Sequence, residues 1–192
     1  MSHTIAILYG SVRPARKGIL AANYLKQQVE ARGHKVHFID PEEHQLPLLQ
    51  KMYKEYDEGK APDYLEKIAS MLKEADGFII VTGEYNHSIP PALKNLLDHF
   101  QKEYFFKPSA IASYSAGRFG GVRAAVHVRA ILGELGMPSI PTMQSYPKVQ
   151  SAFDDNNEPT EEYTEKSTNK FLDEFDWYVE ALKNQRAKGK PY

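Results

Sequence analysis

The chain contains no cysteine, and this absence removes several classes of chemistry. Without thiols there is no disulfide framework, no thiolate nucleophile and no cysteine-ligated zinc or iron–sulfur site. The chain also has no large excess of positive or negative charge, because it contains 24 lysine and arginine residues and 25 aspartate and glutamate residues. Since neutralising phosphates along a strand requires a basic excess, this balance argues against nucleic acid as the main partner.

The sequence also lacks a long apolar run. No stretch approaches the roughly 20 apolar residues that cross a bilayer, and the first residues, MSHT, do not form a secretory signal. We therefore expect a cytoplasmic protein with no membrane partner. The 192 residues fit a single domain over positions 1–192, which is long enough to bury roughly 70% of the surface that the unfolded chain exposes.

Short β-rich segments alternate with helical patterns along the whole chain. The segment 77–82 (GFIIVT) is almost entirely apolar, as expected for a strand buried on both faces. Leu65, Ile68 and Leu72 then form one helical stripe after Pro62, a residue typical of the first helical position. The sequence predicts strands at 4–9, 35–40, 77–82, 108–113 and 139–143, and helices at 19–31, 64–74, 91–100, 122–135 and 160–188.

Five strand–helix units predict a parallel sheet that is covered by helices on both faces. Their number fits an α/β fold with three layers, a doubly wound five-stranded sheet of flavodoxin-like order 2-1-3-4-5. An eight-unit barrel would need about 250 residues. Ligands of such sheets bind beyond the carboxyl ends of the strands, where the strand order reverses. The loops after the first, third and fourth strands are therefore the candidate site.

The first of these loops reads YGSVRPARKG. Gly10 lets the backbone turn close to a ligand, and Ser11 offers a hydroxyl beside the free N–H groups of the next helix. Arg13, Arg16 and Lys17 add three cations where the helix dipole disfavours positive charge, so a phosphate would complement them. The loop has neither the GxGxxG nor the P-loop spacing and specifies no nucleotide class. Solvated cations in an ordinary turn are the alternative.

The loop after the third strand places polar residues between a buried strand and a helix. Gly83 permits close backbone approach, while Glu84 and Asn86 offer hydrogen-bonding groups. Tyr85 offers a ring to a flat ligand. His87 has no second metal ligand at a suitable spacing, so we expect a solvated side chain and no metal site.

The loop after the fourth strand is rich in small residues. Ser115, Gly117, Gly120 and Gly121 would let backbone amides face a phosphate or a polar ring edge, and Arg118 adds a positive charge. Glycines also serve ordinary turns, so this loop alone is a weak signal. Three such loops at the strand ends of one sheet are much stronger evidence for a ligand site.

Together the segments GSVR, EYNHSIPPALKN and SAGRFGG resemble the motifs of the NADPH-dependent FMN reductase family, which includes quinone, azo-dye and chromate reductases. The likeness runs from about residue 4 to about residue 145, and Gly83 stands where the family pattern has a proline. The resemblance implies a flavodoxin-like fold, FMN as cofactor and NADPH or NADH as co-substrate. Hydride would pass to N5 of FMN and then to a quinone, a flavin or another small acceptor by a ping-pong cycle, with no catalytic side chain.

The resemblance also assigns residues to three parts of FMN. Arg118 is in addition a candidate for stabilising negative charge near N1 of the ring. The polar residues of EYNHSIPPALKN that lie in the following helix, Lys94 and Asn95, are expected to brace the structure. The three groups are Gly10, Ser11, Arg13, Arg16 and Lys17 at the phosphate, Gly83, Glu84, Tyr85 and Asn86 at the ring edge, and Ser115, Gly117, Arg118, Gly120 and Gly121 on the other side of the ring.

Two other functions remain open at this point. A flavodoxin-type electron carrier would bind FMN without turning over NAD(P)H, but such carriers are usually strongly acidic and this chain is nearly neutral. A serine hydrolase or a cofactor-free regulatory domain is the second alternative, although Ser11 and Ser115 have no local histidine and acid partners.

The resemblance further implies a homodimer or homotetramer. The polar excursion 44–61 carries Leu48 and Leu49 and is a candidate subunit contact, the alternative being that it folds onto its own core. The last helix carries Phe171 and Phe175, which are expected to pack on the sheet, and we expect the polar tail after it to fray.

Overall fold

The computed structural model describes residues 2–192 and contains one sheet of five parallel strands in the order β2-β1-β3-β4-β5. The predicted fold class and strand order are therefore confirmed. The elements are β1 (Thr4–Tyr9), α1 (Gly18–Ala31), β2 (Lys35–Ile39), a 3-10 turn η1 (Tyr53–Glu55), α2 (Asp63–Glu74), β3 (Gly77–Gly83), α3 (Pro91–Asp98), β4 (Ser109–Tyr114), α4 (Val122–Glu134), β5 (Ser139–Tyr146) and α5 (Glu162–Arg186).

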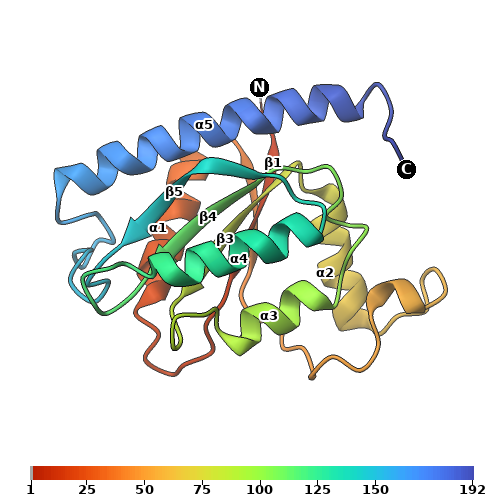
Figure 1. Ribbon diagram of the computed structural model, residues 1–192, viewed down its shortest axis with the longest axis horizontal. Helices are drawn as coiled ribbons and strands as arrows, with labels where there is room; N and C mark the ends of the chain where they lie inside the picture. The colour runs from red at the N-terminus through yellow and green to blue at the C-terminus, as the bar shows by residue number, and fades with distance from the viewer. Residues whose placement is uncertain (1) are drawn as a thin grey trace.

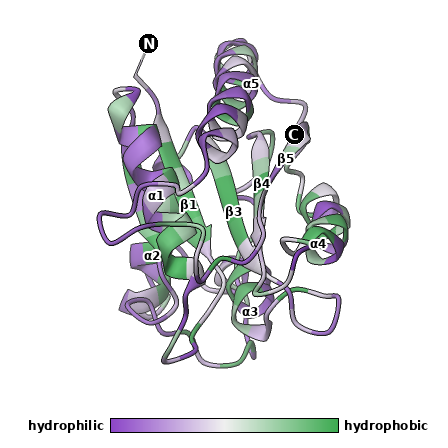
Figure 2. Cartoon of the chain, turned by 90° about the vertical axis from the view of Figure 1, so that its left-hand side faces the viewer, coloured by the Kyte–Doolittle hydropathy of each residue, from purple (hydrophilic) through white to green (hydrophobic). Residues whose placement is uncertain are grey.

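Each face of the sheet carries its own hydrophobic core, because successive side chains of a strand point to opposite faces. In β1, Ile5 and Ile7 pack under α1 and α5, whereas Ala6 and Leu8 pack against α2, α3 and α4. Figure 1 shows α5 and α3 on opposite sides of the strands. Figure 2 shows hydrophobic strands between helices whose outer surfaces are hydrophilic. The molecule thus has three layers.

The observed boundaries differ from the predicted ones mainly at β5, which continues to Tyr146 rather than ending at residue 143. Pro141 and Gln144 interrupt its apolar pattern, and only an edge strand tolerates a proline of this kind. Pro62 lies one residue before α2 rather than within its first turn. None of the helices in residues 2–192 combines the length and the apolar character that crossing a bilayer requires.

The long connection between β2 and α2, which includes the excursion 44–61, packs partly against the core and is partly exposed to solvent. The hydroxyl of Tyr53 donates to Glu66 at 2.8 Å, and its ring packs against the core beside α3. The side-chain amide of Asn95 accepts from the N–H of Leu49 at 3.0 Å and donates to the carbonyl of Pro47 at 2.8 Å. Asn95 is therefore a brace, as its structural interpretation predicts.

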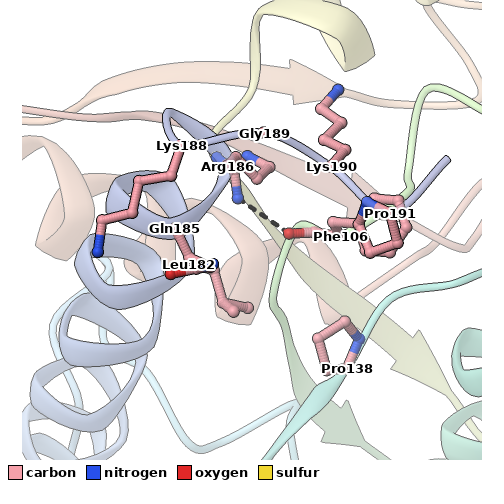
Figure 3. A pocket seen from close by; sticks show the side chains of 9 residues that line it. All are labelled: Phe106, Pro138, Leu182, Gln185, Arg186, Lys188, Gly189, Lys190 and Pro191. Carbon is pink, nitrogen blue, oxygen red and sulfur yellow. Dashed lines mark hydrogen bonds between the residues drawn. The ribbon is translucent and has the colours of Figure 1, made fainter.

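A pocket of about 470 Å³ lies where β4 and β5 begin, beside the end of α5 (Figure 3). Arg186 crosses it and donates to the carbonyl of Phe106 at 3.0 Å. The tail returns over the same place, since the ring centroid of Tyr192 is 4.8 Å from that of Phe106. This pocket is at the amino ends of its strands, the opposite edge of the sheet from the one at which doubly wound folds bind ligands.

Candidate functional site

The loops after β1, β3 and β4 meet at the carboxyl ends of these strands (Figure 1, lower left). They surround a pocket of about 360 Å³. This volume falls within the range of small-molecule sites, roughly 300–1,000 Å³. The pocket lies where the strand order reverses between β1 and β3. The predicted cofactor-binding residues that line it are Ser11, Arg13, Arg16, Lys17, Gly83, Glu84, Tyr85 and Ser115.

The remaining predicted residues lie behind or beside this pocket. A Cβ atom on Gly10 would lie 2.9 Å from the Cβ of Leu93, so Gly10 allows the loop to pack against α3. Gly121 has a φ of 80°, and a Cβ there would lie 2.6 Å from the carbonyl oxygen of Tyr114. Gly117 and Gly120 belong to the same loop, and Arg118 lines a neighbouring pocket of about 270 Å³.

Asn86 lies in a tight turn beside the pocket and does not line the pocket. The backbones of Tyr85 and Ser88 exchange two hydrogen bonds of 2.9 Å, which leaves Asn86 and His87 as the two central residues. Both have positive φ, 49° and 67°, as a hairpin turn of this kind requires. The turn holds Tyr85 at the pocket wall and exposes the side chains of Asn86 and His87, which agrees with the solvated His87 expected from the sequence.

Tyr114 is a wall residue that the sequence did not single out. Its hydroxyl donates to that of Tyr9 at 3.3 Å, and burial raises the pKa of both phenols, so both stay protonated at neutral pH. A Cβ on Gly18 would lie 2.0 Å from Cζ of Tyr114, and one on Gly83 would lie 3.1 Å from it. The space for the Tyr114 ring therefore explains both glycines, including Gly83 in the place of the family's proline.

Val149 and Gln150 also line the pocket and were missed. They follow β5, whose end the sequence pattern places too early. The N–H of Val149 donates to the carbonyl of Ser115 at 3.1 Å, and the Gln150 side chain donates to that of Ala116 at 3.3 Å. These hydrogen bonds form only when β4 and β5 pair, so the local sequence around Val149 and Gln150 does not predict that the two residues line the pocket.

The three cations of the first loop differ in their partners. Arg16 pairs with the buried Asp40, and its second nitrogen lies 3.2 Å from Glu42. The hydrogen bond to Asp40 raises the pKa of Arg16. Within residues 2–192, neither Arg13 nor Lys17 has a carboxylate within 4 Å. The charge of Arg16 is thus neutralised by the protein, which distinguishes Arg16 from Arg13 and Lys17.

Glu84 connects the second loop to the third through its side chain. One carboxylate oxygen accepts from the N–H groups of Arg123 at 3.2 Å and Ala124 at 3.4 Å, at the start of α4. A carboxylate at this position satisfies free N–H groups and complements the helix dipole. The side chain of Glu84 is therefore already engaged within the protein.

The topology defines a flavodoxin-like α/β protein, and a pocket lies at its switch point. Residues 3–149 match the family model described as NADPH-dependent FMN reductase. The chain therefore belongs to the NADPH-dependent FMN reductase family, which is a family of oxidoreductases.

Individual relatives agree with this assignment. A 2-hydroxy-1,4-benzoquinone reductase of Burkholderia sp. is 31% identical over 140 residues, 70% of this chain and 74% of that protein. A quinone reductase of Escherichia coli (strain K12) is 40% identical over 75 residues, but the match spans only 37% of this chain and 40% of the relative. The fold is similar to that of the NAD(P)H:(acceptor) oxidoreductase FerB of Paracoccus denitrificans, with a TM-score of 0.79, 23% identity and coverage of 94% and 98% of the two chains.

Proposed function

We propose that this chain is an FMN-dependent NAD(P)H oxidoreductase that reduces a quinone, a flavin or a similar small acceptor. The observation that carries the proposal is the convergence of three loops at the switch point, where Arg13 and Lys17 have no carboxylate within 4 Å among residues 2–192. Membership of the family and the quinone reductases among its relatives support the same conclusion.

The residues present fit the phosphate end of FMN. Ser11 is only 3% exposed, and its Oγ accepts from the N–H of Arg13 at 3.4 Å, which folds the loop around the start of α1. Helix N-termini bind phosphates because their first N–H groups are free and the dipole favours negative charge. Arg13 and Lys17 would supply the countercharge, and Arg16 would hold the loop in place through Asp40.

The opposite wall fits a flat ring. Tyr85 and Gly83 line one side of the pocket, and Ser115 and Ala116 line the other. The absence of side chains at Gly18 and Gly83 leaves the ring of Tyr114 between them, so its phenol would be the floor of the ring site.

When held by these loops, FMN would supply the redox chemistry, which is hydride transfer from NAD(P)H and two-electron reduction of the acceptor in a ping-pong cycle, with the balancing protons taken from solvent. The chain's own residues position the cofactor and keep one face of the pocket open for both substrates in turn. Tyr9 and Tyr114 stay neutral at the pH of the reaction, so they orient by hydrogen bonding and add no charge to the site.

Steady-state oxidation of NAD(P)H distinguishes a reductase from an electron carrier. We expect the FMN-loaded protein to oxidise NADPH or NADH at steady state when a benzoquinone is present, with parallel double-reciprocal plots. Binding of FMN without oxidation of either nucleotide would contradict the reductase and favour the carrier. Failure to bind FMN would contradict both.

We also propose that the protein is a homodimer or homotetramer. Leu48 is 81% exposed and Val12 is 48% exposed, and both border a pocket of about 530 Å³ beside the first loop. Light scattering on the purified protein measures the mass directly, and a monomer of 21.8 kDa at micromolar concentration would contradict this proposal.

A further inference from the structure

Two arginines flank one exposed aromatic ring in the loop between β4 and α4. Phe119 is 50% exposed, and the guanidinium carbons of Arg118 and Arg123 lie 4.9 and 4.7 Å from its ring centroid. A half-exposed phenylalanine gains only part of the hydrophobic stabilisation of a buried one, so its place between two cations calls for an explanation. The ring holds two long side chains in place before any ligand arrives.

The cluster lies next to the candidate FMN pocket. Ser115 and Ala116, which line that pocket, are only a few residues from Arg118 in the same loop. The backbone N–H of Arg123 is bonded to Glu84, a residue of the facing wall. On the other side, Arg118 lines the pocket of about 270 Å³ together with Lys148. A ligand that extends from the FMN site along this side would reach the cluster.

The charge of the cluster is not balanced within the protein. In the part of the chain that the structure describes, Arg118 has no carboxylate within 4 Å. Among residues 2–192, the one carboxylate within 4 Å of the Arg123 side chain is that of Glu84 at 3.7 Å, which already accepts two N–H groups of α4. Two guanidinium groups fixed on one ring are suited to a phosphate monoester, which carries nearly two negative charges at neutral pH.

We propose that Arg118 and Arg123, aligned by Phe119, bind the 2′-phosphate of NADPH and make the protein select NADPH over NADH. This inference rests on the proposed function, because it assigns the recognition of one of its substrates. NADH carries a hydroxyl at the same position, so it would leave the two guanidinium groups in water and gain nothing from them. Phe119 is a positioning residue, since it acts through the arginines.

The test compares 2′,5′-ADP with 5′-AMP on the protein saturated with FMN, by isothermal titration calorimetry. We expect the wild type to bind 2′,5′-ADP at least 10-fold more tightly than 5′-AMP. The variant Arg118→Gln/Arg123→Gln should lose this difference, and Phe119→Leu should reduce it while keeping both charges. Lys102→Gln is the matched control, because Lys102 is exposed at the amino end of β4 and should leave the difference unchanged.

Kinetics give a second readout. In Arg118→Gln/Arg123→Gln, measured at saturating FMN, kcat/KM should fall about 10- to 100-fold more for NADPH than for NADH. Equal losses for the two nucleotides, or equal binding of 2′,5′-ADP and 5′-AMP by the wild type, would overturn the inference. A protein that oxidises neither nucleotide would contradict the proposed function instead, and the calorimetry would still decide the role of the arginines.

Discussion

The ring of Tyr114 fills the space beside Gly18 in which any other residue would place its side chain. A Cβ on Gly18 would lie 2.0 Å from Cζ of Tyr114, so the two positions are coupled although 96 residues of sequence separate them. Gly18 starts α1 and Tyr114 ends β4, so this contact joins the phosphate end of the pocket to its ring end.

The first prediction follows from this contact. Gly18→Ala should push the Tyr114 ring into the pocket, lower the affinity for FMN by about 10-fold or more and destabilise the protein by about 1–3 kcal/mol, the usual cost of overpacking. Helix propensity alone predicts the opposite sign, since alanine is favoured over glycine by about 1 kcal/mol. Fluorescence titration with FMN and urea unfolding measure the two effects.

Gly133 provides the control for that substitution. It is exposed within α4, its φ is not positive, and a Cβ there would meet no atom within 4 Å. Gly133→Ala should therefore leave FMN binding unchanged and increase stability slightly. If Gly18→Ala behaved in the same way, the contact with Tyr114 would not matter for the site.

A second prediction concerns the phosphate. Arg13→Ala should weaken the binding of FMN by about 10- to 100-fold, because a charge-assisted hydrogen bond is lost. Riboflavin lacks the phosphate, so its affinity should change less than 3-fold. Titration of both ligands into wild type and variant gives the comparison, and equal losses would remove Arg13 from the phosphate site.

Arg16 should affect stability. Asp40 is 2% exposed, and Arg16→Gln would leave its carboxylate buried without a charged partner. Breaking such a pair typically costs about 3–5 kcal/mol, which urea unfolding would show as a lower midpoint. Arg13→Gln is the matched control, because Arg13 is exposed and its loss should leave the free energy of unfolding within about 0.5 kcal/mol of wild type. Similar midpoints for the two variants would contradict the structural role of Arg16.

The stability of the protein should depend on His3 below neutral pH. Burial, Lys183 and His34 lower the pKa of His3 below its ordinary value of 6.5, against the opposing effect of Asp76 and Glu180. The unfolded chain therefore takes up this proton first, and stability is lost as the pH falls through 6.5 towards the lowered folded pKa. Above that range the contribution of the neutral imidazole is fully present.

Urea unfolding of wild type and His3→Asn at pH 7.5 and 5.5 isolates this effect. The wild type should lose more free energy of unfolding between the two pH values than the variant does. A variant with the same pH dependence as the wild type would show that His3 does not contribute.

Local sequence patterns predicted the fold well. Hydrophobic periodicity and the glycines that end strands and helices reflect local backbone geometry, so they show where each element lies. The strand order follows from the number of strand–helix units and the location of the strand ends. The candidate site was predicted as far as it depends on residues that follow buried strands, such as Ser11, Tyr85 and Ser115. Tyr114, Val149 and Gln150 were missed, because they reach the pocket only through pairing and packing across the sheet.

Sequence alone cannot show which groups Arg16 and Arg118 contact, although Arg16 does line the pocket as predicted. Sequence shows three cations in one loop but does not show that the buried carboxylate of Asp40 neutralises one of them. In the same way, sequence places Arg118 in a glycine-rich loop, whereas its stacking on Phe119 is a matter of side-chain packing.

The most direct test of the central proposal is an absorbance scan of the purified protein, followed by anaerobic titration with NADPH. The account predicts a flavin spectrum with maxima in the visible range, either as purified or after loading with FMN, which one equivalent of NADPH bleaches and a quinone restores. A protein that takes up no FMN, or a bound flavin that neither NADPH nor NADH bleaches, would contradict it.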